Sequence, residues 1–176
     1  TTGVYHQTDG SWVDEDSAVE PTREGGRVHL QAEQLLQQQW PESLTTVLRL
    51  SGIYGPGRVP RVADVLAGRP IASPQDGFLN LIHVEDAASA VMSTWSQAKH
   101  PLYLVSDDCP VIRGEFYREV ARKGDCPPPT FREPDSDAPV MMRSSANKRV
   151  CNLRMKKDLV GELRYPSFRE GLADVM

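Results

Sequence analysis

The stretch TTVLRLSGIY at residues 45–54, followed by GPG at residues 55–57, decides the fold. Its β-branched and aliphatic residues form a nearly continuous apolar run, which favours a strand buried on both faces in a parallel sheet. Open α/β sheets bind ligands at the carboxyl ends of such strands, and glycine lets the backbone approach a ligand closely. A plain tight turn explains YGPG equally well. We therefore expect a buried parallel strand whose end is either a ligand-facing edge or a simple turn.

The residues before this strand predict a strand–helix–strand unit with a right-handed crossover. TTGVYH at residues 1–6 is strand-prone, residues 9–26 are polar and punctuated by Gly and Pro, and residues 27–40 have helical spacing. A domain rarely opens in the middle of a strand, so we expect the chain to continue a sheet begun upstream. The helix should turn one apolar face to the sheet, carrying Val28, Ala32, Leu35 and Leu36.

The residues after position 57 continue the alternation of strands and helices. Strands are predicted at residues 79–84 and 102–105, and residues 125–139 read as a loop. Helices are predicted at residues 60–66, 85–95, 110–123 and 155–163, and a last helix is opened by the capping box Ser167-x-x-Glu170. The fold class is therefore α/β: a partial Rossmann-like, doubly wound parallel sheet with a smaller α/β subdomain.

The composition argues against several classes of function, namely nucleic-acid binding, membrane association and metal binding. The chain has 176 residues, 39% of them hydrophobic and 25% charged, with a net charge of -4, which argues against general nucleic-acid binding. No apolar run approaches the roughly 20 residues of a membrane span, so we expect no membrane partner. Cys109, Cys126 and Cys151 are odd in number and read as reduced thiols of a cytoplasmic protein. The four histidines lack HxH or HExxH spacing, so we expect no metal site.

Two further patterns each allow two readings. His83 follows a predicted strand and begins a helix, so it either donates to a ligand or caps the helix, and capping is favoured. The stretch 143–157 is basic throughout, and a polyanion or phosphate site competes there with a solvated basic face, which is favoured. Its cations are Arg143, Lys148, Arg149, Arg154, Lys156 and Lys157.

Taken in order, these motifs resemble the extended short-chain dehydrogenase/reductases, the NAD(P)-dependent sugar-nucleotide epimerases and dehydratases. TTGVYH resembles their SSTxVYG segment, VLRLSGIYGPGR resembles RxxxxYGPG, and LNLIHVEDAASAV resembles (R)xxIHVxDxAxA. A bacterial subgroup similar to nucleoside-diphosphate-sugar epimerases also shares SDDCPVIRGEFY, SANKRVCN and YPSFREGL. The resemblance covers nearly the whole chain.

The resemblance implies how the chain is organised and what it binds. The chain looks like the C-terminal half of a longer protein, with residues 1–53 in the NAD(P)-binding Rossmann domain and residues 54–176 mainly in a substrate-binding subdomain. Some of the latter segments would return to the sheet. The cofactor would be NAD or NADP, although no GxxGxxG loop occurs in this chain. The partners would be a sugar nucleotide or a related small molecule, and a second copy of the chain through the helix at residues 27–40.

The same resemblance implies an atypical active site. The catalytic Ser/Thr position falls on Thr1, but the Tyr and Lys positions of the YxxxK pair fall on Gly25 and His29, and Leu79 stands where an Arg often binds pyrophosphate. The implied catalytic residues are Thr1 and His29. The implied cofactor-binding residues are Thr1, Thr2, His29, Ser51, Gly52 and Ile53. The implied substrate-binding residues are Tyr54, Arg58, His83, Lys148 and Arg149.

Two functions follow from this pattern. The first is an epimerase- or dehydratase-like oxidoreductase in which His29 or Tyr54 replaces the missing acid–base group. The second is a catalytically inactive scaffold of the same fold that binds a dinucleotide or serves in a complex. Loss of both the Tyr and the Lys favours the second function on mechanistic grounds.

Overall fold

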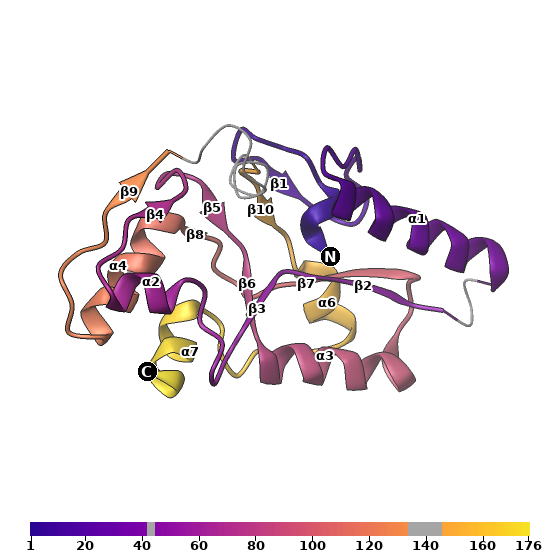
Figure 1. Ribbon diagram of the computed structural model, residues 1–176. Coiled ribbons are helices and arrows are strands. Elements are labelled where there is room, and N and C mark those ends of the chain that lie inside the picture. The colour runs from indigo at the N-terminus through magenta and orange to yellow at the C-terminus, as the bar shows by residue number, and fades with distance from the viewer. Residues whose placement is uncertain (42–44, 134–145) are drawn as a thin grey trace.

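The computed structural model describes residues 1–41, 45–133 and 146–176, and Figure 1 shows how its elements are arranged. The helices are the 3-10 turn η1 (Thr2–Val4), α1 (Glu24–Gln39), α2 (Val62–Leu66), α3 (Val84–Gln97), α4 (Arg113–Lys123), α6 (Leu153–Asp158) and α7 (Phe168–Val175). The strands are β1 (Trp12–Val13), β2 (Val47–Leu50), β3 (Gly52–Tyr54), β4 (Ile71–Ala72), β5 (Phe78–Leu79), β6 (Leu81–His83), β7 (Leu102–Val105), β8 (Val111–Ile112), β9 (Phe131–Arg132) and β10 (Arg149–Val150).

The decisive stretch forms two short parallel pairings, which confirms the parallel α/β prediction. β2 pairs with β7, and β3 pairs with β6. The chain changes partner at Ser51, whose N–H donates to the Val105 carbonyl, while the next N–H, of Gly52, donates to the Asn80 carbonyl. The pairing of residues 45–54 therefore passes from β7 to β6 at Ser51, at the carboxyl end of β2.

Helices cover both faces of the β2–β7 pair, as expected of a buried parallel strand. Leu104 of β7 packs in a cluster with Val4 and Val150, with Leu30 of α1 packed against it. Its neighbours Tyr103 and Val105 point the other way, into a cluster with residues of α3 and α6. In Figure 1, α1 and α3 accordingly lie on opposite sides of these strands.

A second hydrophobic core lies at the other end of the molecule, among α2, α4 and α7 (Figure 1). Its largest buried side chains include Tyr54, Phe116 and Leu172. The small pairs beside it are β4 with β9, which is parallel, and β5 with β8, which is antiparallel. The division of the chain near residue 53 remains a prediction.

The predicted first strand is wrong. Residues 2–4 form the turn η1, which Thr1 caps by accepting a hydrogen bond from the Gly3 N–H at 3.2 Å. Strand-prone residues form a strand only where a partner strand completes the ladder, and no described strand pairs with this segment. The predicted strand–helix–strand unit therefore lacks its first strand, while the predicted loop at residues 9–26 contains the short strand β1 and the first residues of α1.

The helix predicted at residues 27–40 is present as α1, but it buries a different face. Val28 and Leu35 are 55% and 57% exposed, and Ala32 is exposed as well. Leu36, which was predicted on the buried face, is half-buried, and the other half-buried positions near it are Leu30 and Glu33. The reason is an ion pair between Glu33 and the buried Arg49 of β2, at 2.7 Å. This ion pair turns the Glu33 side of the helix toward the sheet.

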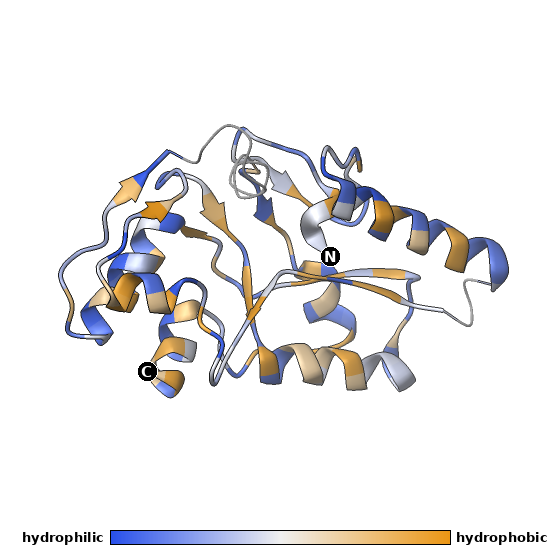
Figure 2. Cartoon of the chain, in the orientation of Figure 1, coloured by the Kyte–Doolittle hydropathy of each residue, from blue (hydrophilic) through white to orange (hydrophobic). Residues whose placement is uncertain are grey.

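Several large apolar side chains remain on the surface of the described residues. Trp40 follows α1, and Met92 and Trp95 lie on α3. Figure 2 shows further hydrophobic positions along both helices. Pairing of two copies through α1 stays a prediction. None of the described helices is both long and apolar enough to cross a bilayer.

Candidate functional site

A cavity of about 310 Å³ opens at the carboxyl end of β2, where the pairing changes from β7 to β6. It brings together five of the residues predicted from sequence: Thr1, Thr2, Ser51, Gly52 and Lys148. The remaining lining residues are Gly3, Arg23, Leu50, Phe78, Leu79, Asn80, Arg113 and Ala146. Among the described residues, a ligand at this edge would therefore meet three hydroxyl groups, one amide and three cations, and no carboxylate.

A buried polar network fixes the Thr1–Gly3 turn beside this cavity. The Arg49 guanidinium donates to Glu33 of α1 and, at 2.7 Å, to the Tyr5 hydroxyl oxygen. The Tyr5 hydroxyl in turn donates to the Asp14 carbonyl at 2.8 Å. Strand β2, helix α1 and the N-terminal turn are thus tied to one guanidinium, which sets where Thr1 stands.

Lys148 is held in the cavity wall by its neighbours on both sides. The Asn80 side chain donates to the Lys148 carbonyl at 2.9 Å and accepts from the Val150 N–H at 2.7 Å. The Lys148 ammonium donates to the Tyr5 carbonyl at 3.3 Å. Burial, reinforced by the positive charge of Arg23, lowers the pKa of Lys148 to about 8.

Arg113 is a site residue that the sequence reasoning missed. Only 5% of it is exposed, and its guanidinium donates to the Pro74 carbonyl and lies where a Gly77 side chain would stand. One signal could have found it. Arg113 is the first residue of α4, where the helix dipole disfavours a cation, and a locally unfavourable residue often marks a functional site.

Ser51 tests whether the cavity fits a nicotinamide cofactor. Its hydroxyl oxygen is buried and has no hydrogen-bond partner among the described residues. A buried hydroxyl without a partner is costly, so its satisfaction by a polar ligand group is favourable. With Thr2 and Gly52 beside it, the Ser51 hydroxyl gives the cavity polar groups of the kind that such a cofactor needs.

The other predicted site residues lie elsewhere. His29 and Gly25 are exposed on α1, Arg58 is exposed after β3, and none of them lines the cavity. Ile53 and Arg149 are half-buried outside it.

Tyr54 and His83 are fully buried within the fold. Burial, with Asp107 and Asp86 nearby, raises the pKa of the Tyr54 hydroxyl, which donates to the Ser167 carbonyl. The His83 ring accepts from the Glu85 N–H, so the predicted helix cap is confirmed.

Asp107 lies near Tyr54 and gives a testable pH dependence. Burial raises the pKa of Asp107 to about 8 from its ordinary value of 3.8, although the Cys109 N–H opposes this shift. Because the folded-state pKa is the higher one, Asp107 favours folding below about pH 4. This contribution is lost as the pH rises to about 8, by at most about 1.4 kcal/mol per pH unit.

We expect Asp107→Asn to flatten the dependence of the unfolding free energy on pH between 5 and 8, relative to the wild type. Asparagine keeps the acceptor for the Cys109 N–H and cannot ionise. Urea unfolding at several pH values measures the difference. Asp76→Asn, at an exposed position, is the matched control and should follow the wild type. Parallel profiles for wild type and Asp107→Asn would contradict the assignment.

Within residues 146–157, most of the basic stretch is not a solvated face, contrary to the favoured reading. Arg149 donates to the Gly10 carbonyl and lies over the Trp12 and Phe78 rings, and Arg154 pairs with Asp16. These two cations therefore bind other parts of the chain. Lys156 does the same, because it pairs with Asp108. Lys157 is exposed, and Arg143 lies outside the described residues.

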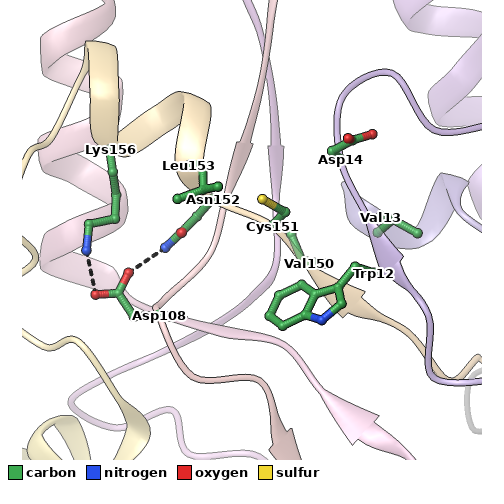
Figure 3. A pocket seen from close by; sticks show the side chains of 9 residues that line it. All are labelled: Trp12, Val13, Asp14, Asp108, Val150, Cys151, Asn152, Leu153 and Lys156. Atoms are coloured by element: carbon green, nitrogen blue, oxygen red, sulfur yellow. Dashed lines mark hydrogen bonds and ion pairs between the residues drawn. The ribbon is translucent and has the colours of Figure 1, made fainter.

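A larger cavity of about 510 Å³ lies beside β1 and β10 (Figure 3). Lys156 of the basic stretch lines it, but none of the site residues implied by the family resemblance does. Its charges are also already satisfied, since Asp108 accepts from Asn152 at 2.8 Å and from Lys156 at 2.7 Å, as the dashed lines in Figure 3 mark. The smaller cavity at Ser51, which brings together five of the residues predicted from sequence, is the better candidate site. Nowhere in the described ranges do three or more His, Cys, Asp or Glu residues gather as metal ligands would.

Comparison with known proteins places the chain among Rossmann-like folds. No family model matches it. Protein YeeZ of Escherichia coli K12 is 31% identical over 167 residues, which cover 94% of this chain and 57% of YeeZ. A solved structure of a functionally unknown conserved protein from Silicibacter pomeroyi DSS is 36% identical, with a TM-score of 0.86, over 99% of this chain and 63% of that one.

Two structures with described activities are similar as well. One is described as an NAD-dependent epimerase/dehydratase from Methylobacillus flagellatus, with 27% identity and a TM-score of 0.76 over 99% of this chain and 60% of that one. The other, the UDP-glucose 4-epimerase of Thermotoga maritima solved with UDP-glucose, has 17% identity and a TM-score of 0.80 over 99% and 60%, a likeness of fold alone. The chain thus spans about three fifths of the length of these relatives, between 57% and 63%.

Proposed function

We propose that the chain belongs to the extended short-chain dehydrogenase/reductase family and supplies the substrate end of an NAD(P)-dependent, epimerase- or dehydratase-like oxidoreductase. The substrate in this proposal is a sugar nucleotide or a related small molecule. The active site is atypical, because Gly25 and His29 stand at the Tyr and Lys positions.

One observation carries the proposal: residues that are distant in the sequence line one cavity. This cavity lies where the family resemblance leads us to expect the reaction. Thr1, Ser51 and Lys148 all line it, although they come from the N-terminal turn, the end of β2 and the segment before β10. The carboxyl end of a parallel strand is also where this class of sheet binds ligands. The convergence therefore supports a binding site rather than a plain turn.

The roles in the proposal follow from the chemistry of each group. When bound, NAD(P) supplies the acceptor or donor of a hydride. Ser51 and Gly52 hold its polar end, and the Thr1 hydroxyl orients the reacting oxygen of the substrate. His29 and Tyr54 do not line the cavity, so neither is assigned the proton transfer.

A catalytically inactive binder is the alternative, and a specific observation favours it. Position 25, where the family places its tyrosine acid–base group, is a glycine exposed on α1, and the buried Tyr54 hydroxyl is turned to Ser167 instead. Such a protein would bind a dinucleotide without turning over a substrate. The two functions make different predictions for the same measurements.

The test uses the protein in its natural length. We expect NADH or NADPH fluorescence to change on titration with the protein, and sugar nucleotides to be oxidised or epimerised in its presence. Thr1→Val should lower turnover about 10²- to 10⁴-fold with little change in cofactor binding. Thr94→Val, on α3 outside the cavity, is the control. Cofactor binding without turnover of any sugar nucleotide would establish the inactive binder, and no cofactor binding would contradict both functions.

A further inference from the structure

The larger cavity, beside β1 and β10, has apolar walls that the fold leaves open. Val13 and Val150 line it and are almost fully buried. Trp12 and Leu153 line it as well, but they are 53% and 70% exposed. Its volume of about 510 Å³ is in the range of cavities that hold a small molecule. Large apolar side chains that gather around such a hollow are typical of a ligand site.

The Trp12 ring is placed to stack on a ligand. The Arg149 guanidinium lies over the indole, 5.1 Å from the ring centroid, and so covers one face of it. Figure 3 shows the indole and Leu153 on opposite sides of Cys151. A flat aromatic molecule between them would contact the uncovered part of the ring on one side and Leu153 on the other, which is a favourable aromatic arrangement.

The charged side chains that line the cavity already have partners. Asp108 accepts from Lys156 at 2.7 Å and from Asn152 at 2.8 Å. The Asp14 carboxylate accepts from the Ser17 hydroxyl at 2.6 Å, and this hydrogen bond lowers the pKa of Asp14. A charged ligand would have to break one of these pairs or lose water without gaining a partner, and both are costly. The cavity therefore suits an uncharged ligand.

One polar acceptor in the lining is still available. The Asn152 side chain is buried, and its N–H groups donate to the Ser106 carbonyl at 2.9 Å and to Asp108. An asparagine at the start of a helix usually caps it, but Asn152 makes no such bond to α6. Its Oδ1 accepts no hydrogen bond from the described residues. Because two bonds fix this amide, a ligand donor can bind to it with little loss of entropy.

We propose that the larger cavity is a second small-molecule site, whose ligand is an uncharged, flat aromatic molecule with an N–H or O–H donor. The ring lies between Trp12 and Leu153, and the donor bonds to the Asn152 oxygen. The inference goes beyond the proposed function, because among the described residues this cavity shares no lining residue with the cavity at Ser51. The ligand is therefore distinct from the NAD(P) and the substrate of that site.

The Cys151 thiol reports on whether the cavity is occupied. This thiol is free and lines the cavity, and Figure 3 shows its sulfur on the side of Asn152. Iodoacetamide should alkylate Cys151 in the protein of natural length, and a ligand in the cavity should slow this reaction in a saturable way. Mass spectrometry of the digested protein measures each cysteine separately. Cys126 is also free and half-buried but lies outside this cavity, so it is the internal control.

Three probes of one skeleton separate the features of the ligand. N-phenyl-1-naphthylamine is uncharged and carries one N–H group. 1-Benzylnaphthalene has a methylene group in place of that N–H group, and 8-anilino-1-naphthalenesulfonate adds a negative charge. We expect the amine to protect Cys151 most strongly. The benzyl compound should bind about 3- to 10-fold more weakly, because it cannot donate to Asn152. The sulfonate should bind at least about 10-fold more weakly, because no lining cation is left to pair with it.

Substitutions test the two apolar walls. Trp12→Ala should weaken protection by the amine about 10-fold, because stacking and buried apolar area are lost. Trp40→Ala is the matched control, since Trp40 is 52% exposed and lies outside the cavity. It should behave like the wild type. Leu153→Ser changes the opposite wall at an exposed position, where folding should be unaffected, and should weaken protection about 3- to 10-fold.

Several results would overturn the inference. If iodoacetamide did not reach Cys151 in the free protein, the cavity would be closed. Equal protection of Cys126, or protection that neither Trp12→Ala nor Leu153→Ser weakens, would mean non-specific adsorption of the probe. Tighter binding of the sulfonate would refute an uncharged ligand, and equal binding of the amine and the benzyl compound would refute the hydrogen bond to Asn152. Protection by NADH or NADPH would make the cavity part of the cofactor site.

Discussion

Replacement of Arg49 by methionine is expected to lower the free energy of unfolding by about 3–5 kcal/mol. The side chains of Arg49 and Glu33 are 7% and 12% exposed, so the substitution would leave a carboxylate buried without its partner. It would also remove the guanidinium donor to the Tyr5 hydroxyl, which helps to fix the N-terminal turn. Urea unfolding followed by far-ultraviolet circular dichroism measures the loss.

Two further variants separate the buried pair from ordinary charge effects. Arg122→Met breaks a pair with Glu119 in which the arginine is exposed, and it should cost no more than about 1 kcal/mol. The double variant Arg49→Met with Glu33→Leu should recover much of the stability, because an apolar pair often replaces a buried ion pair at little cost. A single variant Arg49→Met as stable as Arg122→Met would contradict the network described here.

Gly171→Ala is the second change with a large expected effect. We expect it to lower the free energy of unfolding, although helix propensity alone predicts an increase. Alanine normally stabilises a helix interior by roughly 0.5–1 kcal/mol relative to glycine. In α7, however, a Cβ on Gly171 would overlap the Tyr54 hydroxyl oxygen and stand 2.6 Å from its ring. Tyr54 is fully buried and cannot move aside. We expect a loss of about 3 kcal/mol in the free energy of unfolding.

The chain offers a matched control for this substitution. Gly25 also lies in a helix, α1, but nothing lies within 4 Å of where its Cβ would be, so Gly25→Ala should stabilise the protein. Adding Tyr54→Phe to Gly171→Ala removes the hydroxyl and should restore part of the loss. Equal effects of Gly171→Ala and Gly25→Ala in the same unfolding assay would contradict the packing of α7 on Tyr54.

The fold was largely predictable because its signals are local. The apolar run at residues 45–54 indicated buried parallel strands, and Ser167 with Glu170 indicated the start of α7. The errors came where distant residues decide. Residues 1–6 have strand propensity but no described partner strand, and α1 is oriented by the Glu33–Arg49 pair rather than by Val28 and Leu35.

The candidate site was only partly predictable for the same reason. Thr1, Ser51 and Lys148 were identified by resemblance and by charge, but their meeting in one cavity depends on how the chain folds. Arg113 gave only a weak signal, since a single arginine at a helix start has many explanations. Its importance comes from burial beside Gly77, which no spacing in the sequence reveals.

The surface positions of the three tryptophans have a spectroscopic consequence. Trp12, Trp40 and Trp95 are 53%, 52% and 95% exposed, so all three indoles already face water in the folded protein. Their emission should be red-shifted before any denaturant is added, and unfolding should move its maximum little. Trp12, in the wall of the larger cavity and stacked on Arg149, is placed instead to report by quenching on whatever enters there.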